Sequence, residues 1–135
     1  MTNNPFSQIY SDEVMDHIRK PRNMGYITHP DGEAMIGNPV CGDIMKFYIK
    51  VSQIDGEYYI KDIKFQTLGC GAAIATSSMM TVLVKGKSFK EAAKVSKRTI
   101  VTALKGLPKA KIHCSVLADE ALKKAIKNFK SKIKK

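Results

Sequence analysis

Three cysteines, Cys41, Cys70 and Cys114, are the side chains of this sequence that point most directly to chemistry. Glycine follows Cys41 and stands on both sides of Cys70. A backbone without a Cβ atom can approach a metal ion or a cluster closely and can present its N–H groups to sulfur. Because three thiols cannot all pair in disulfides, we expect reduced cysteines that are free to bind a metal.

A carboxylate and an imidazole accompany two of these cysteines. Asp43 follows Cys41 by two residues, and His113 directly precedes Cys114. Three thiolates with one oxygen or nitrogen donor form a harder ligand set than four cysteines. An exchangeable fourth ligand of this kind would hold an iron–sulfur cluster loosely, which suits transfer better than storage.

Two other interpretations of this pattern stay open on spacing alone. The same donors can complete a tetrahedral zinc site, although a hydrolytic zinc site also needs a general base, and no glutamate adjoins the candidate ligands. Alternatively, the cysteines are small buried hydrophobic residues without a shared function. His17 and His29 have no cysteine neighbour, so we predict that they are surface or packing residues.

The N-terminal third of the chain predicts one helix followed by a loop-rich segment. Residues 7–19 have the pattern of a short amphipathic helix that Pro21 ends. Residues 22–43 are rich in glycine, proline and asparagine, which predicts turns and irregular extended segments. Cys41 is therefore expected on a loop.

An antiparallel hairpin and a buried helix are expected next. Apolar residues alternate with polar ones over 46–51, and Asp55-Gly56 supplies a turn before a second strand within 58–67. Small and apolar residues then fill 72–84, which is typical of a buried helix. Cys70 is thus predicted at a junction between a strand and a helix.

Three further helices are predicted in the remainder. Ser88 and the glutamate three residues later form a capping box that begins a short helix, and another helix is expected over 97–105. Apolar residues recur at steps of three or four through 118–133, which predicts a long amphipathic C-terminal helix. Cys114 stands at its start, where we expect the helix dipole to lower the pKa of the thiol.

These elements predict an α+β fold in which a small antiparallel β-sheet packs against several α-helices, with residues 1–135 forming a single domain. No apolar stretch is long enough to span a bilayer. The first twenty residues lack the apolar core of a signal peptide, and their acidic residues argue against a transit peptide. We therefore expect a cytoplasmic protein without membrane association.

The net charge of +11 is concentrated in the C-terminal part of the chain. Residues 85–135 contain sixteen basic and three acidic side chains, whereas residues 1–84 contain seven basic and nine acidic ones. Such a charge can attract acidic protein partners or phosphate groups, whereas lysines on the outer face of helices are usually only solvated. The lysines lack the interleaved aromatic residues of an RNA-binding surface, so nucleic-acid binding is not expected as the main function.

Three segments around the cysteines closely resemble the signature segments of the IscU/NifU-like scaffold family. They read GNPVCGD (37–43), LGCGAAIATSS (68–78) and KIHCS (111–115). The resemblance extends to DHIRKPRN (16–23) and to the C-terminal helix, so it covers nearly the whole chain. The chain looks most like the single-domain IscU type, without the additional cysteine-containing domains of full-length NifU.

This resemblance implies a scaffold rather than an enzyme of conventional turnover. Members of the family receive persulfide sulfur from a cysteine desulfurase, combine it with iron and with electrons from a donor such as a ferredoxin, and pass a [2Fe-2S] cluster to recipient apoproteins. Independently of the resemblance, zinc can occupy the same site, because this borderline-soft ion competes well for thiolates. Whether the cluster bridges two chains in a homo-oligomer, and in which order iron and sulfur are loaded, stays open.

The resemblance also implies roles for five residues. By position, Cys41, Cys70 and Cys114 match the three cysteines of the family, Asp43 matches its aspartate and His113 its histidine. Cys114 is then expected to accept the persulfide first, and Asp43 to tune the stability and release of the cluster. Either Asp43 or His113 would be the fourth ligand.

One segment departs from the family pattern. Residues 107–111 read LPKAK where the motif for a DnaK-type chaperone normally reads LPPVK. Lys109 and Ala110 change both the stiffness and the apolar contact that this peptide would offer, which argues against chaperone-assisted release. Lys111 is retained, and its ammonium group would either lower the pKa of nearby thiols or pair with Asp43.

Overall fold

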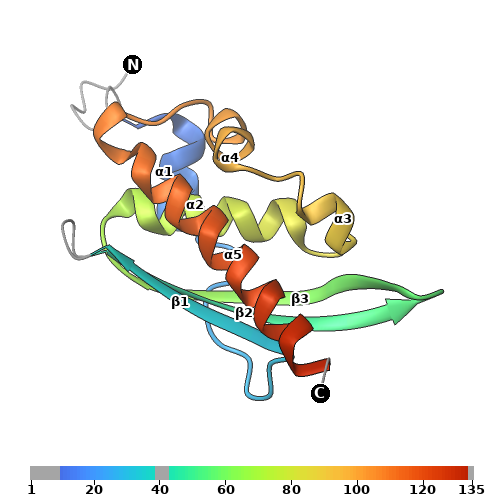
Figure 1. Ribbon diagram of the computed structural model, residues 1–135. Coiled ribbons are helices and arrows are strands. Elements are labelled where there is room, and N and C mark those ends of the chain that lie inside the picture. Colours follow the sequence, from blue (N-terminus) through green and yellow to red (C-terminus); the bar gives the residue numbers. More distant parts are fainter. Residues whose placement is uncertain (1–9, 39–42, 134–135) are drawn as a thin grey trace.

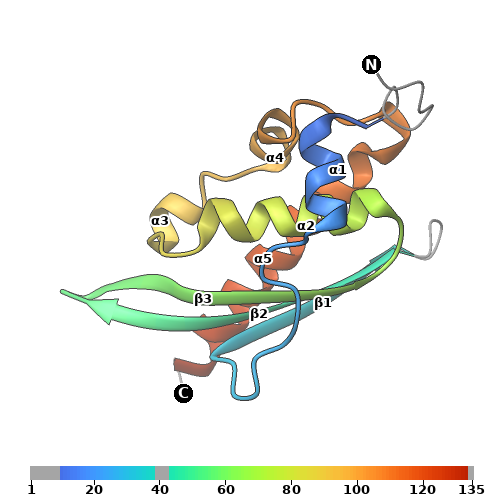
Figure 2. The ribbon, with the colours of Figure 1, turned by 180° about the vertical axis from the view of Figure 1, so that it is seen from behind.

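The computed structural model describes residues 10–38 and 43–133. A three-stranded antiparallel sheet in the order β1-β2-β3 carries the helices on one face (Figures 1 and 2). Its strands are β1 (Gly32–Asn38), β2 (Asp43–Ile54) and β3 (Glu57–Leu68). The helices are α1 (Asp12–Arg19), α2 (Gly71–Val84), α3 (Phe89–Ala92), α4 (Lys97–Ala103), the short 3-10 helix η2 (Lys109–Lys111) and α5 (Ile112–Ile133). The predicted α+β class is confirmed, and so is the long C-terminal helix.

The predicted hairpin is present as β2 and β3. Asp55 and Gly56 connect the two strands with φ angles of 53° and 84°, the left-handed values that a tight hairpin turn requires. The strands are longer than the alternating segments alone indicated, and β3 runs directly into the junction at Cys70.

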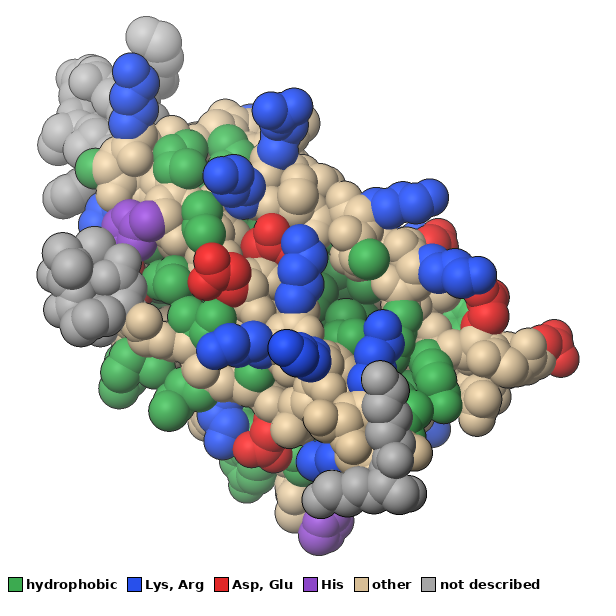
Figure 3. Space-filling view, in the orientation of Figure 1, with side chains coloured by type: hydrophobic (Ala, Val, Ile, Leu, Met, Phe, Trp, Pro, Cys, Tyr) green, Lys and Arg blue, Asp and Glu red, His purple; other side chains and the backbone are tan. Residues whose placement is uncertain are grey.

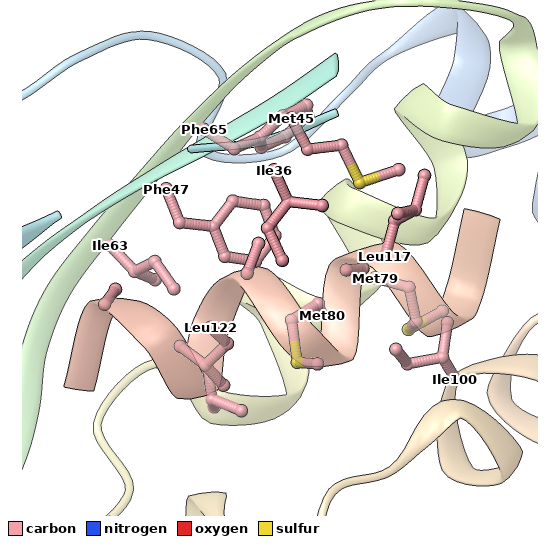
Figure 4. Packing of buried hydrophobic residues seen from close by; sticks show 14 of the residues in the cluster. Ile36, Met45, Phe47, Ile63, Phe65, Met79, Met80, Ile100, Leu117 and Leu122 are labelled. Carbon is pink, nitrogen blue, oxygen red and sulfur yellow. The ribbon is translucent and has the colours of Figure 1, made fainter. Parts of the chain in front are cut away.

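The hydrophobic core lies between the sheet and helices α2 and α5 (Figure 4). Phe47 of β2 and Phe65 of β3 point into it, and their rings meet edge to face with centroids 6.3 Å apart. Met80 of α2 and Leu122 of α5 are buried against them. Because α2 is apolar on nearly all sides, it forms the central helix, as its composition predicts.

β1 corrects one expectation, since residues 22–43 were predicted to be irregular. Gly32 to Asn38 instead form an edge strand paired with β2. Its inward positions include Ala34 and the buried Ile36, while two glycines interrupt the apolar pattern. The strand was not predicted because glycine lowers strand propensity. In this strand, Gly32 permits a close approach of α5.

We expect Gly32→Ala to destabilise the protein by about 1–3 kcal/mol, because overpacking of a close contact displaces the backbone. A Cβ atom on Gly32 would lie 2.5 Å from the carbonyl oxygen of Ala125 in α5. Gly37→Ala is the matched control on the same strand, since its Cβ would meet Ile44 Cγ1 at an ordinary 3.5 Å. Urea unfolding of both variants measures the difference, and equal losses would contradict this packing.

The shorter helices begin at side-chain caps. Ser11 Oγ accepts a hydrogen bond from the Val14 N–H at 3.1 Å and fixes the start of α1 at Asp12, later than the predicted helix over 7–19. The capping box before α3 is confirmed, because the Glu91 N–H donates to Ser88 Oγ at 3.1 Å and the Ser88 N–H donates to Glu91 Oε1 at 3.4 Å. Residues 7–9 lie outside the described residues.

The two histidines without cysteine neighbours lie where packing or solvent predicts them. His17 is buried between α1 and α2, with Nδ1 2.7 Å from Ser78 Oγ, which confirms a packing role. His29 is exposed on a loop. Within the described ranges, none of the helices has the length and apolar character needed to cross a membrane.

Candidate functional site

Three segments that are far apart in the sequence meet at one end of the sheet. β2 begins at Asp43, β3 leads into α2 through Cys70, and α5 begins with Ile112 and His113 (Figure 1). Cys70 occupies the position just before the first residue of α2, as the strand-to-helix junction predicted. Cys114 lies in the first turn of α5. These elements bring four of the five predicted site residues together.

The donor atoms of Asp43, His113 and Cys114 form a compact group within 4.8 Å of one another. Asp43 Oδ2 lies 3.2 Å from His113 Nε2 and 3.5 Å from Cys114 Sγ, and Cys114 Sγ lies 3.6 Å from His113 Nε2. Neighbouring ligands of a tetrahedral metal with bonds of 2.0–2.3 Å are separated by about 3.3–3.8 Å. The spacing therefore already approximates that of a metal-binding set.

Cys70 extends this group by a second thiol. Its Sγ lies 3.9 Å from Cys114 Sγ, and both cysteines are free. This separation is far longer than a disulfide bond and close to the distance between two sulfur ligands on one metal. Cys70 and Cys114 can thus act as a pair of soft donors beside the harder oxygen and nitrogen of Asp43 and His113.

Backbone contacts hold the Asp43 carboxylate in place from its other side. The Cys70 N–H donates to Asp43 Oδ1 at 3.3 Å. A Cβ atom on the preceding residue, Gly69, would lie only 2.5 Å from the same oxygen. Glycine before Cys70 is therefore needed so that the carboxylate can reach the site, which gives this residue a more specific role than general backbone freedom.

The two thiols differ in burial. Cys114 is fully buried, whereas Cys70 is partly exposed. Burial, followed by the charges of Cys70 and Asp43, raises the pKa of the Cys114 thiol well above its usual range. The expectation that the helix dipole lowers this pKa was wrong, because desolvation at the start of α5 outweighs the dipole. Cys114 is therefore a protonated thiol until a metal or a sulfur donor displaces the proton.

This difference predicts unequal reactivity in the metal-free protein. We expect iodoacetamide to modify Cys114 at least about tenfold more slowly than Cys70, because the thiolate is the reactive form and must be accessible. Mass spectrometry of digested samples taken over time measures the two rates separately. In denaturant the rates should converge, and equal rates in the folded protein would contradict the burial of Cys114.

Lys111 and Tyr10 also lie close enough to Cys70 for its charge to affect them. The charge of the Cys70 thiolate raises the pKa of Lys111, so its ammonium group lies on the thiol side of the site. Asp43 contacts His113 instead, and none of the ion pairs among the described residues joins Asp43 to Lys111. Burial raises the pKa of Tyr10, followed by the charge of Cys70. No motif in the sequence indicated Tyr10, which precedes the cap of α1.

Cys41 falls in 39–42, outside the described residues, so its role stays a prediction. Among the described residues, an exposed apolar surface lies beside Asp43. Met24, Met35, Ile44 and Leu68 are exposed and line a hollow of about 480 Å³ on the outer face of the sheet. Ile44 directly follows Asp43, so this surface reaches the edge of the site.

Comparison with known proteins places the chain in a family. Residues 9–135 match the model of the NifU-like N terminal domain family. The chain is 54% identical over 121 residues to iron–sulfur cluster assembly scaffold protein IscU 1 of Archaeoglobus fulgidus, covering 90% of this chain and 76% of that protein. It is 48% identical over 126 residues to the IscU scaffold protein of Escherichia coli K12, covering 91% of this chain and 95% of that protein.

Solved structures support the fold at lower sequence identity. A nitrogen-fixing NifU-like protein (N-terminal) from Brucella abortus superposes with a TM-score of 0.70 at 19% identity, covering 94% of this chain and 98% of that one. FiSufU of Fervidobacterium islandicum gives a TM-score of 0.72 at 23% identity, covering 89% and 98%. Together, the family match over nearly all residues and the identity to IscU proteins show that this chain belongs to the IscU/NifU-like family of iron–sulfur cluster assembly scaffold proteins.

Proposed function

We propose that this protein assembles [2Fe-2S] clusters from iron and from persulfide sulfur supplied by a cysteine desulfurase, and then transfers them to recipient apoproteins. Residues 1–135 act as a single scaffold domain. A ferredoxin-type donor supplies the electrons, and the protein itself is a carrier rather than an enzyme. We also propose a cytoplasmic location, in keeping with the free thiols of Cys70 and Cys114.

The donor geometry is the observation that carries this proposal. The Asp43 carboxylate, the His113 imidazole and the Cys114 thiol lie 3.2–3.6 Å from one another, and the Cys70 thiol lies 3.9 Å from that of Cys114. Cys70 and Cys114, together with Cys41, would provide soft thiolate ligands, which iron–sulfur clusters require. Asp43 or His113 would provide the harder fourth ligand, which exchanges more readily and so favours release.

Sulfur enters this scheme as a persulfide. The sulfur of Cys114 attacks the terminal sulfur of the desulfurase persulfide, and the desulfurase cysteine leaves as a thiolate. Two electrons from the donor then reduce the new persulfide to sulfide and regenerate the Cys114 thiolate. Asp43 is well placed to accept the proton that Cys114 must lose, because its Oδ2 lies 3.5 Å from Sγ.

Two features of the proposal concern other ligands and partners. Zinc competes for the same donors, because it binds thiolate, imidazole and carboxylate in tetrahedral sites. We treat zinc as an occupant of the site rather than as the function. We do not include chaperone-assisted release in the proposal. Lys109 is charged and Ala110 is small, and both are exposed in the 3-10 turn before α5, so they offer little apolar contact to a chaperone.

Transfer to a recipient tests the proposal. The protein is loaded anaerobically with ferrous iron, cysteine and a desulfurase, and is then mixed with an apo-ferredoxin of the [2Fe-2S] type. We expect the circular dichroism spectrum of the holo-ferredoxin to appear while the scaffold loses iron and sulfide together. If holo-ferredoxin forms equally fast from free iron and sulfide without the scaffold, the proposed transfer is wrong.

A further inference from the structure

We propose that a surface between α3 and α5 docks an acidic segment of a protein partner that carries an apolar side chain among its acidic residues. A hollow of about 300 Å³ opens there. Its apolar floor includes Phe89, Ala93 and Ile126, and Lys123, Lys127 and Lys130 of α5 line it. We call these six residues the α3–α5 surface.

The α3–α5 surface is separate from the cluster site. Lys127 follows Cys114 by thirteen residues on the same helix, which corresponds to roughly 20 Å along an α-helix. At that distance, a partner bound here would not cover the site around Cys70 and Cys114. The inference therefore goes beyond cluster assembly and does not depend on the identity of the cluster.

Positive charge on this surface is only partly neutralised. Lys123 pairs with Asp119 at 2.8 Å. Across residues 10–38 and 43–133, no carboxylate forms an ion pair with Lys127 or Lys130. Lys130 Nζ instead lies 5.8 Å from the centroid of the Phe89 ring. Carboxylates of a partner would complement these free ammonium groups and accelerate its association.

The apolar floor favours a protein partner over a membrane or a nucleic acid. The face of α5 that could enter a lipid layer is already buried against the sheet, including Leu122, Ala125 and Phe129. Phosphate groups would form ionic contacts with the lysines but no favourable contact with the apolar floor. An apolar side chain flanked by carboxylates uses both features, in the manner of an anchor residue within a polar rim. Figure 3 shows lysine and arginine side chains around apolar ones on this side of the molecule.

Fluorescence anisotropy with the metal-free protein tests the proposal. The probe is a dye-labelled polyglutamate peptide with a central Leu-Phe pair, and the same peptide with Ser-Ser serves as comparison. We expect Lys127→Glu/Lys130→Glu to weaken binding of the Leu-Phe peptide at least about tenfold, because two charges at the contact are reversed and the net charge falls by four. Lys20→Glu/Lys61→Glu changes the net charge equally at exposed positions elsewhere and should have little effect.

A second variant tests the hollow without changing the charge. Ala93 is exposed at the end of α3, so Ala93→Leu should fill the hollow while the fold is kept, as thermal unfolding will show. We expect it to weaken binding of the Leu-Phe peptide and to leave the Ser-Ser peptide unchanged. Binding should also weaken as sodium chloride is raised.

Three results would overturn the proposal. Equal losses in the two double variants would mean that net charge alone attracts the peptide. Equal affinity for the Leu-Phe and Ser-Ser peptides would remove the role of the apolar floor. Binding of phosphatidylglycerol vesicles or of a DNA duplex that depends on Lys127 and Lys130, without binding of the Leu-Phe peptide, would assign the surface to a membrane or to nucleic acid instead. None of these results depends on cluster loading.

Discussion

Cys114→Ser is expected to lose the assembled cluster. Replacing a residue that only hydrogen-bonds to a metal ligand typically costs roughly 10–100-fold in metal affinity, and loss of the ligand itself should cost more. Serine keeps the shape of the side chain but replaces a soft thiolate by a hydroxyl group that does not ligate iron in this way. The buried Sγ of Cys114 approaches Asp43, His113 and Cys70 at once. The other thiol among the described residues is that of Cys70, which is itself a proposed ligand.

Iron and acid-labile sulfide, measured after anaerobic gel filtration, give the occupancy of this variant. Ser115→Ala is a suitable control, because Ser115 is buried in the same turn but its Oγ donates to the Ile112 carbonyl oxygen rather than to the site. Circular dichroism checks that both variants are folded. Normal cluster content in Cys114→Ser would exclude Cys114 as a ligand.

The Asp43→Ala variant is expected to hold an assembled cluster about tenfold longer before transfer. Mutation of residues that contact metal ligands typically changes metal affinity by about this factor. The charge of Asp43 contributes to the raised pKa of Cys114, so its removal makes the thiolate ligand easier to form. Its removal also frees His113 Nε2, which lies 3.2 Å from the carboxylate. The imidazole nitrogen, which is softer than a carboxylate oxygen, then completes the ligand set and exchanges less readily than Asp43 would.

Asp43→Asn distinguishes the effect of the negative charge of Asp43 from the effect of its hydrogen bond with the Cys70 N–H. The amide keeps an oxygen that can accept the Cys70 N–H, a hydrogen bond that measures 3.3 Å in the wild-type protein, but it removes the negative charge. Stopped-flow transfer to apo-ferredoxin should be slow in both variants if the carboxylate drives release. Transfer at the wild-type rate in both variants would show that Asp43 does not control release.

Much of the fold follows from local patterns. The hairpin of β2 and β3 was predictable because apolar residues alternate on both sides of Asp55-Gly56, and α5 because its apolar residues keep a helical period. β1 was not predictable in this way. Its conformation depends on pairing with β2 and on contact with α5, and Gly32 serves that contact rather than local propensity.

The site was predictable in its composition but not in its electrostatics. The sequence identified Asp43, Cys70, His113 and Cys114 through their flanking residues, and the structure brings these four together. The pKa of Cys114 was expected to be low, because helix position is visible in a sequence and burial is not. Tyr10 was missed for the same reason, since only the docking of α1 brings it near Cys70.

The stoichiometry of iron and acid-labile sulfide tests the central claim most directly. The wild-type protein is loaded anaerobically with ferrous iron, cysteine and a cysteine desulfurase, and both elements are measured per chain. The proposal predicts equal amounts of iron and sulfide in the wild-type protein and the loss of both in Cys41→Ala, Cys70→Ala and Cys114→Ala. Metal without sulfide in every preparation would contradict cluster assembly and would make this a zinc or mononuclear iron protein.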